Sequence, residues 1–219
     1  MCVNYLPVPK RTLHDFFSVL PPDEDWAGEV WQDYSAPILR AEDQARKALL
    51  ANYGFLPKRK LPPGVRYSTM NARAETLGQL KSYRQAWQQC QLCLVPMLGF
   101  FEPCYESGKA ERYRVSLLHD EPFAVAGLRR SWLEDDGRQT YSFTQITINA
   151  DDHPLMKRMH KPGDEKRNLV IVPKTDYDAW LDCRNVELAR TFLHNYPAEH
   201  MLAIPAPRKP AKPVTDSLF

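Results

Sequence analysis

The stretch C-L-V-P-M-L-G-F-F-E-P, residues 93 to 103, predicts a strand that turns at Gly99 and continues into two aromatic residues and a carboxylate. Glu102 directly follows Phe100 and Phe101. An apolar setting raises the pKa of a carboxyl group, which makes Glu102 a candidate for proton transfer. The alternative is an ordinary glutamate at the end of a strand.

The segments around this stretch predict both strands and helices. Three strand candidates follow it, each alternating or β-branched, and Asp135-Asp136-Gly137 predicts a hairpin turn between the last two. The predicted strands are 36–40, 112–118, 122–128, 141–149 and 169–172, and the predicted helices are 10–20, 77–89, 177–181 and 186–194. With 19 Pro and only 9 Gly, we expect irregular connections between these elements.

Composition bounds the class of protein. The 219 residues suit one domain with a substantial core, and 43% hydrophobic with 26% charged residues is typical of a soluble globular protein. No apolar run is long enough to span a membrane, and Pro7, Pro9 and Lys10 interrupt any signal-peptide pattern. Five irregularly spaced cysteines favour a reducing, cytoplasmic setting. The net charge of +2 means that any nucleic-acid surface must come from local clustering.

The first two residues, Met1-Cys2, carry a distinct chemistry. Cysteine is small enough to permit removal of the initiator methionine, which leaves Cys2 with a free α-amine beside its thiol. The ordinary pKa values of these groups, about 8 and 8.5, leave a reactive fraction of each at neutral pH. Together they can trap an aldehyde, first as an imine and then as a five-membered thiazolidine ring. The alternative is an unremarkable chain start.

Three further segments are functional candidates. N-A-R-A-E-T, from Asn71 to Thr76, is either a capped helix entry or a polar cluster aimed at a ligand. Lys58-Arg59-Lys60 follows the turn A-N-Y-G-F-L-P and is either a solvated patch or a phosphate-facing loop. His160 lies between a helix end and a strand, where a titrating imidazole could act.

Two other features carry less information. Cys90 and Cys93 have zinc-ligand spacing but lack a matching second pair, so a zinc site is disfavoured. Beyond Leu202 the Pro- and Lys-rich sequence predicts a flexible tail, which divides the chain into a domain of residues 1–202 and a tail of residues 203–219.

These features occur in one order: Met-Cys, the aromatic-G-F-L-P turn, N-A-R-A-E-T, C-L-V-P…G-F-F-E, and a late His160 before an apolar strand. The order resembles the SRAP family, the SOS response-associated peptidase-like proteins that shield abasic sites in single-stranded DNA. P-F-A-V-A-G-L at 122–128 is similar to the family's P-Y-A-F-A-G-L. The resemblance implies a single α+β domain around a curved, mainly antiparallel β-sheet with flanking helices.

The resemblance also implies roles for individual residues. Cys2 would be the covalent residue, Asn71 would hold the reacting group, and Glu102 and His160 would handle protons. Arg73 would contact DNA phosphate. From the basic triplet and the aromatic turn before it, we also expect Tyr53 and the Lys58, Arg59 and Lys60 segment to belong to the DNA-binding surface. No cofactor or metal is implied. The same cluster would remove Met1 by self-cleavage.

The chain departs from the family pattern in three places. Val3-Asn4 replaces Gly-Arg after the initial Met-Cys, so one expected DNA contact is missing. The family's W-G-L-I-P followed by tryptophan is Y-G-F-L-P-K here, at residues 53 to 58. His160 is followed by Lys161-Pro162-Gly163 where the family has D-R-M-P.

The sequence therefore predicts a monomeric protein that crosslinks covalently to abasic sites in single-stranded DNA, in the cytoplasm near the nucleoid or replication machinery. The alternatives are a cysteine peptidase that acts on other proteins, with Cys2 as nucleophile and His160 as base, and a damaged-DNA-binding module without covalent chemistry. The final Ser217-Leu218-Phe219 resembles short Leu-Phe peptides that dock on the bacterial sliding clamp; a frayed chain end is the alternative.

Overall fold

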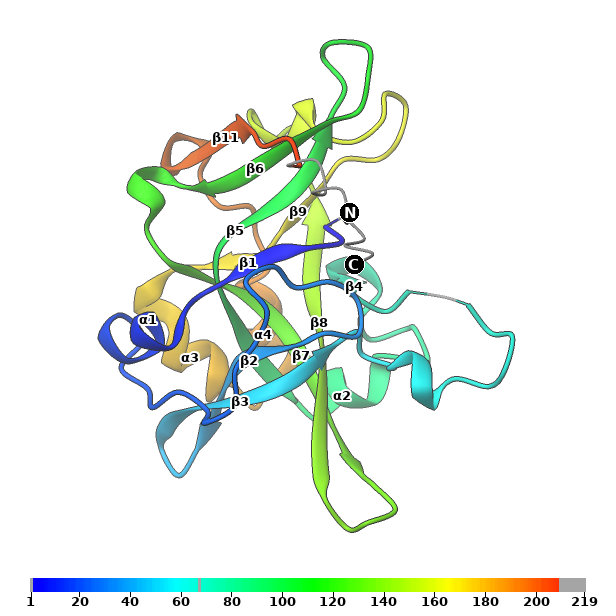
Figure 1. Ribbon diagram of the computed structural model, residues 1–219, viewed down its shortest axis with the longest axis vertical. Helices are drawn as coiled ribbons and strands as arrows, with labels where there is room; N and C mark the ends of the chain where they lie inside the picture. The colour runs from blue at the N-terminus through cyan, green and yellow to red at the C-terminus, as the bar shows by residue number, and fades with distance from the viewer. Residues whose placement is uncertain (1, 67, 209–219) are drawn as a thin grey trace, which may run out of the picture.

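The computed structural model describes residues 2–66 and 68–208 and is organised around one long strand, β5 (Leu92–Cys104). Its first half pairs with β7 along one edge and touches β2 at a single pair, Leu39 with Leu94. Its second half pairs with β6 on one edge and β1 on the other. This strand, shown in blue-green in Figure 1, therefore connects both ends of the sheet.

The sheet contains eleven strands in the described part of the chain, and four short α-helices lie against it. The strands are β1 (Tyr5–Pro7), β2 (Ser35–Glu42), β3 (Ala45–Tyr53), β4 (Asn71–Arg73), β5, β6 (Glu111–Leu117), β7 (Phe123–Leu133), β8 (Gln139–Asn149), β9 (Arg167–Leu169), β10 (Ile171–Val172) and β11 (Met201–Pro205). The helices are α1 (Lys10–Asp15), α2 (Arg84–Gln88), α3 (Tyr177–Leu181) and α4 (Val186–Thr191). None of the described helices is both long and apolar enough to cross a membrane.

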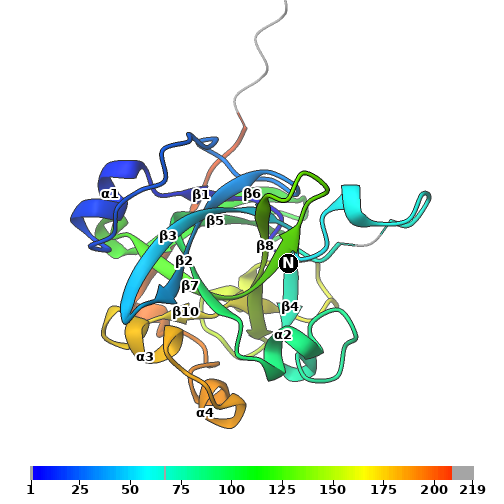
Figure 2. The same cartoon turned by 90° about the horizontal axis from the view of Figure 1, so that it is seen from below.

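The sheet curves until it closes on itself. The strands β2, β3, β8, β7 and β5 each pair with the next, and β5 returns to β2. Most pairings are antiparallel; β3 and β4 both run parallel to β8. Viewed from below, the strands surround a central core, and α3 and α4 lie outside them (Figure 2). The predicted fold class, a single α+β domain around a curved, mainly antiparallel sheet, is confirmed.

Two apolar clusters fill the two faces of this sheet, because successive side chains of a strand point to opposite sides. On β7, Phe123 and Val125 join the cluster that also contains Cys2, whereas Ala124 and Ala126 join the cluster covered by the helices. Trp180 of α3 belongs to the helix-covered cluster, and its indole nitrogen donates to the backbone carbonyl of Cys93 at 2.8 Å. Cys2 is therefore part of a core, on the face away from the helices.

Several predicted elements differ from the observed ones. The chain does not turn at Gly99, which lies within the continuous strand β5. Glycine is needed there because a Cβ atom would lie 2.8 Å from the backbone oxygen of Val115 on the neighbouring strand. The helix predicted over 10–20 ends at Asp15, and Ser18 has a left-handed φ of 59°. The helix predicted over 77–89 is helical only over Arg84–Gln88. Helix α3 and the hairpin turn at Gly137 are as predicted.

The C-terminal strand crosses the predicted domain boundary at Leu202. Strand β11 pairs with β6 from Met201 to Pro205, and the backbone nitrogen of Ala206 donates to Arg112. Residues 203–205 are thus part of the sheet. The sequence A-I-P alone does not show this, because the strand depends on pairing with β6, which is distant in the chain. Met1 and the predicted clamp-binding residues Ser217-Leu218-Phe219 lie outside the described residues.

Candidate active site at the N-terminal cysteine

The N-terminal segment places Cys2 beside the second half of β5. Tyr5 is opposite Phe100, and the backbone nitrogen of Phe101 donates to the carbonyl of Asn4 at 3.2 Å, so the chain continues antiparallel to β5 toward its start. The Cys2 side chain is buried, with 1% of its surface exposed, and its thiol donates to the carbonyl of Asn4 at 3.3 Å. Cys2 is therefore fixed in place and is not part of a frayed end.

Two side chains hold the Cys2 carbonyl. The amide nitrogen of Asn71, on β4, donates to it at 2.6 Å, and the hydroxyl of Tyr53, on β3, lies 3.2 Å away. The Tyr53 hydroxyl is also 3.1 Å from the side-chain oxygen of Gln145 on β8. Strand β4 pairs with β8 so that Asn71 lies opposite Gln145, which explains why these three polar groups meet below Cys2.

Asn71 keeps one buried group available for a ligand. Its side-chain oxygen is buried, and no donor among the described residues reaches it. Buried polar atoms are nearly always hydrogen-bonded in folded proteins, so this oxygen is well suited to accept a hydrogen bond from a hydroxyl of a bound molecule. Asn71 is the first residue of a strand rather than the helix cap that was the alternative.

Glu102 and His160 form a second buried pair at the same site. The His160 ring nitrogen Nε2 is 3.0 Å from Glu102 Oε2, and the two side chains are 7% and 3% exposed. His160 has a left-handed φ of 64°, which costs energy for a residue with a side chain. Its backbone nitrogen donates to Pro103 at 2.7 Å, and the adjacent Met159 bridges to Cys104. The end of β5 thus fixes both partners.

The charge of Glu102 acts on Cys2. Burial raises the pKa of the Cys2 thiol well above its usual value, and the negative charge of Glu102 raises it further. The thiol is consequently protonated at neutral pH. The structure therefore brings together the four predicted reactive residues: Cys2 with Asn71, Glu102 with His160, and Glu102 with Cys2.

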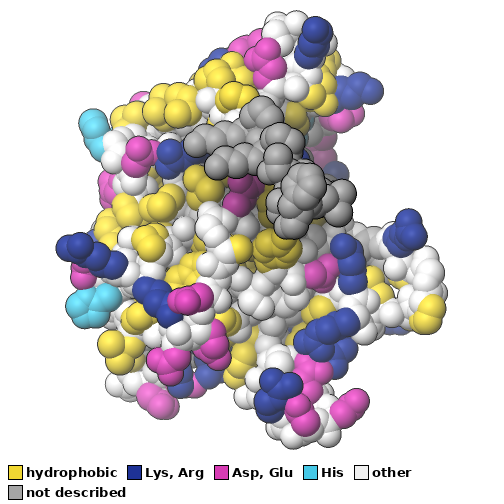
Figure 3. Space-filling model, viewed as in Figure 1, with side chains coloured by type: hydrophobic (Ala, Val, Ile, Leu, Met, Phe, Trp, Pro, Cys, Tyr) yellow, Lys and Arg dark blue, Asp and Glu magenta, His cyan; other side chains and the backbone are white. Residues whose placement is uncertain are grey.

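The charged residues predicted to bind DNA pair with carboxylates. Arg73 contacts Glu165 at 2.9 Å, and the Lys58, Arg59 and Lys60 segment contacts Asp33 and Glu134. Figure 3 shows positive and negative side chains side by side on the face that carries these segments. Their role in DNA binding stays a prediction.

Tyr53 differs from its predicted role. Its ring is fully buried, stacked on Phe143 and edge-on to Tyr5, with centroid distances of 5.2 and 5.4 Å. A buried ring offers no surface on which a base could stack. Tyr53 instead supports Cys2 from within the core, which the A-N-Y-G sequence could not reveal.

Gln145 is the site residue that sequence reasoning missed. It is fully buried on β8, where its side chain shares a face with Phe143. A polar residue in phase with the buried side of an alternating strand was the available signal.

The two cysteines with zinc-ligand spacing, Cys90 and Cys93, lie on opposite sides of the sheet. Cys90 and Cys93 belong to different apolar clusters, and both are buried. Among the described residues, no group of three His, Cys, Asp or Glu side chains could hold a metal ion.

The fold and the site together define a single curved-sheet domain in which an asparagine and a tyrosine hold a buried cysteine near the N-terminus, beside a glutamate–histidine pair. The family model "SOS response associated peptidase (SRAP)" matches residues 10–211, and the chain belongs to this family. The matched residues include Asn71, Glu102 and His160; Cys2 precedes them.

Curated relatives and solved structures agree with this assignment. The chain is 29% identical over 154 residues to the Abasic site processing protein YoqW of Bacillus subtilis, covering 69% of this chain and 65% of that protein. The Abasic site processing protein YobE of the same organism is also 29% identical, with 69% and 67% covered. The matched region thus spans about two thirds of the length of these relatives.

Among solved structures, a protein from Bordetella bronchiseptica has a TM-score of 0.83 and 31% identity, covering 94% of this chain and all of that one. A protein from Bacteroides thetaiotaomicron, with a TM-score of 0.74 and 21% identity over 92% and 90% of the two chains, shows the same fold.

Proposed function

We propose that this protein processes abasic sites in single-stranded DNA by forming a thiazolidine crosslink between Cys2 and the aldehyde of the opened sugar. One observation carries the proposal: Cys2, Asn71, Glu102 and His160 converge on one buried site from four separate segments of the chain. The names of the curated relatives support abasic-site processing as the activity.

The first chemical step requires a free α-amine on Cys2. The amine attacks the aldehyde carbon of the sugar to give a carbinolamine, which loses one water to become an imine. The Glu102 carboxylate, whose charge acts at Cys2, takes the proton that the attacking amine nitrogen releases and passes it to the departing hydroxyl, which leaves as water. Asn71 and Tyr53 hold the Cys2 carbonyl, so the amine keeps a fixed direction relative to the bound sugar.

The second step closes the ring. The Cys2 sulfur bonds to the imine carbon while the imine nitrogen takes up a proton, so the thiol proton balances the step without an external acid. A buried thiol that remains protonated at neutral pH is suited to this addition. His160, held beside Glu102, would assist the earlier opening of the closed sugar.

The same residues would remove Met1. Cleavage of the Met1-Cys2 bond liberates the α-amine that the first step uses, and Glu102 with His160 would move the protons of that hydrolysis. The chain would thus activate itself at the site where it later reacts with DNA.

The alternative function, a peptidase for other proteins, is disfavoured because the His160 ring that would serve as its base pairs with Glu102 at 3.0 Å, while the Cys2 thiol donates to the carbonyl of Asn4. A non-covalent damaged-DNA-binding module would not need a protein nucleophile at all.

Incubation with single-stranded DNA that contains one abasic site separates these functions. We expect a heat-stable adduct with the wild-type chain and none with Cys2→Ser, while both bind the DNA equally before heating. An adduct that survives Cys2→Ser, or no adduct with either chain, would reject the crosslinking function.

A further inference from the structure

The basic loop Lys58-Arg59-Lys60 pairs with two carboxylates. Arg59 donates two hydrogen bonds to Glu134, at 3.0 and 2.8 Å, and Lys60 donates a third at 2.7 Å. Lys58 contacts Asp33 through its backbone nitrogen at 3.0 Å and its ammonium at 3.4 Å. The segment that the sequence marks as a phosphate-binding loop is therefore already paired with anions.

Glu134 is the centre of this arrangement. It begins the turn between β7 and β8, which is distant in sequence from the basic loop. Its side chain is only 15% exposed, compared with 51% for Arg59. Thr140 donates to the same carboxylate, and the Lys60 ammonium lies 5.8 Å from the Trp132 ring centre. Hydrogen bonds from Arg59, Lys60 and Thr140 keep the pKa of Glu134 well below its usual range, so the carboxylate is ionised throughout the neutral range.

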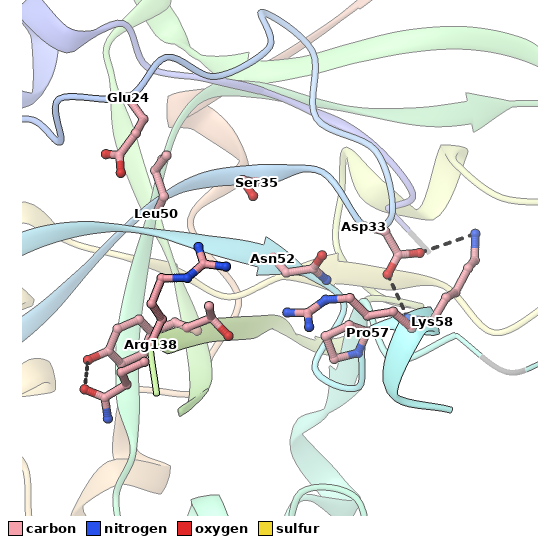
Figure 4. Close-up of a pocket in the computed structure, with 12 residues that line it drawn as sticks. Glu24, Asp33, Ser35, Leu50, Asn52, Pro57, Lys58 and Arg138 are labelled. Carbon is pink, nitrogen blue, oxygen red and sulfur yellow. Dashed lines mark hydrogen bonds and ion pairs between the residues drawn. The ribbon is translucent and has the colours of Figure 1, made fainter. Parts of the chain in front are cut away.

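Open space adjoins this contact. A hollow of about 920 Å³ lies where β3 and β8 diverge below their pairing at Asn52 and Ser142, and Lys58, Arg59 and Arg138 line it. Figure 4 shows Lys58 paired with Asp33 at its rim, with Arg138 extending into the same space. A second hollow, of about 450 Å³, is lined by Arg59 and Arg138 together with Glu134, Asp135, Asp136 and Thr140. A phosphodiester group can therefore approach Arg59 without rearrangement of the core.

We propose that Glu134 limits the affinity of this surface for nucleic acid: its carboxylate occupies the positions on Arg59 and Lys60 that a DNA phosphate takes, and binding of a strand displaces it. This inference rests on the proposed function, because it takes single-stranded DNA as the ligand. Since Glu134 contributes one negative charge against the two positive charges of Arg59 and Lys60, these three residues together present a net charge of +1 to the DNA instead of +2.

Salt dependence tests the inference, because the slope of log K against log salt counts the phosphates that a protein neutralises. We would titrate a fluorescent single strand without an abasic site from about 50 to 200 mM salt. Glu134→Gln keeps the shape of the side chain but frees one net positive charge. We expect binding about 2- to 30-fold tighter at low salt, and a slope steeper by about 0.7.

Asp135→Asn is the matched control, since it removes the same charge from the adjacent residue, and Asp135 forms no ion pair with any described residue. The inference requires a clearly larger effect from Glu134→Gln, and it requires that effect to vanish when Arg59 and Lys60 are both alanine. Equal effects of the two substitutions, an unchanged slope, or an effect that persists without Arg59 and Lys60 would overturn it.

The same variants separate this inference from the proposed function. Saturating abasic DNA should give the wild-type yield of adduct with the control Asp135→Asn, because Asp135 lies outside both the Cys2 cluster and the contacts of the basic loop. Loss of the adduct in every chain, with the slope still changed by Glu134→Gln, would reject the crosslink and leave the competition by Glu134 intact.

Discussion

Replacing Tyr53 with phenylalanine tests whether the core holds Cys2 in place. A tyrosine hydroxyl has one hydrogen to donate, and two acceptors lie near it: the Cys2 carbonyl at 3.2 Å and the Gln145 oxygen at 3.1 Å. Tyr53→Phe removes this donor and leaves the ring packing unchanged. The Cys2 carbonyl keeps its shorter bond from Asn71, so the main loss is one buried hydrogen bond.

Such a loss costs about 1–2 kcal/mol of unfolding free energy, because a buried acceptor is left without its donor. We expect urea denaturation to show this decrease, and adduct formation to slow by less than about tenfold, since each 1.4 kcal/mol corresponds to a factor of ten. The modest rate effect follows from the remaining Asn71 contact.

Tyr5→Phe is the internal control. The Tyr5 ring touches the Tyr53 ring and is equally buried, but its hydroxyl has no hydrogen-bond partner among the described residues. Its removal should change stability by less than about 0.5 kcal/mol or increase it. If Tyr5→Phe destabilises as much as Tyr53→Phe, the hydrogen bonds under Cys2 are not what holds the site.

Three further predictions concern other parts of the molecule. Arg167→Met should lower the unfolding free energy by about 2–4 kcal/mol, because the Arg167 side chain is 3% exposed and bonded to Glu75, Glu165 and Thr147. Arg158→Met, which breaks an exposed ion pair with Glu106, should lower it by less than about 1 kcal/mol. Equal losses in thermal or urea unfolding would contradict this prediction. Burial raises the pKa of Cys93 from 9.0 to about 12, so the folded state holds a proton that the unfolded state loses, and the unfolding free energy should fall as pH rises from 9 toward 12. Cys93→Ala should make that fall shallower by about 1.4 kcal/mol per pH unit. An unchanged slope would show that Cys93 does not titrate in this range. Glu102→Gln should slow adduct formation by about 10²–10⁴-fold on every substrate, whereas loss of His160 should slow capture of the closed sugar but not of a permanently open aldehyde; equal slowing of both variants on both substrates would refute the division of roles.

Much of the sheet could be predicted because local patterns decide it. In each of the segments 122–128 and 141–149, successive side chains point into the two apolar clusters on opposite faces of the sheet. Gly137, with a positive φ, lies in the hairpin turn that joins the two strands. The turn predicted at Gly99 is absent, because this glycine allows the backbone of β5 to pass close to Val115 of β6, a strand further along the chain.

The candidate site was predictable only in part. A motif can indicate Cys2, Asn71, Glu102 and His160, and the structure brings these residues together. It cannot show that Tyr53 lies inside the core, or that Glu134 meets Arg59 across 75 residues, since both depend on how distant strands pair.

The central claim is that Cys2, freed of Met1, bonds to the abasic sugar. Mass spectrometry of the heat-stable adduct, after digestion of both protein and DNA, tests it directly. The account predicts an N-terminal peptide that begins at Cys2, lacks Met1, and carries the sugar with the loss of one water. A peptide that retains Met1 in the adduct, or a sugar attached to any other residue, would contradict it.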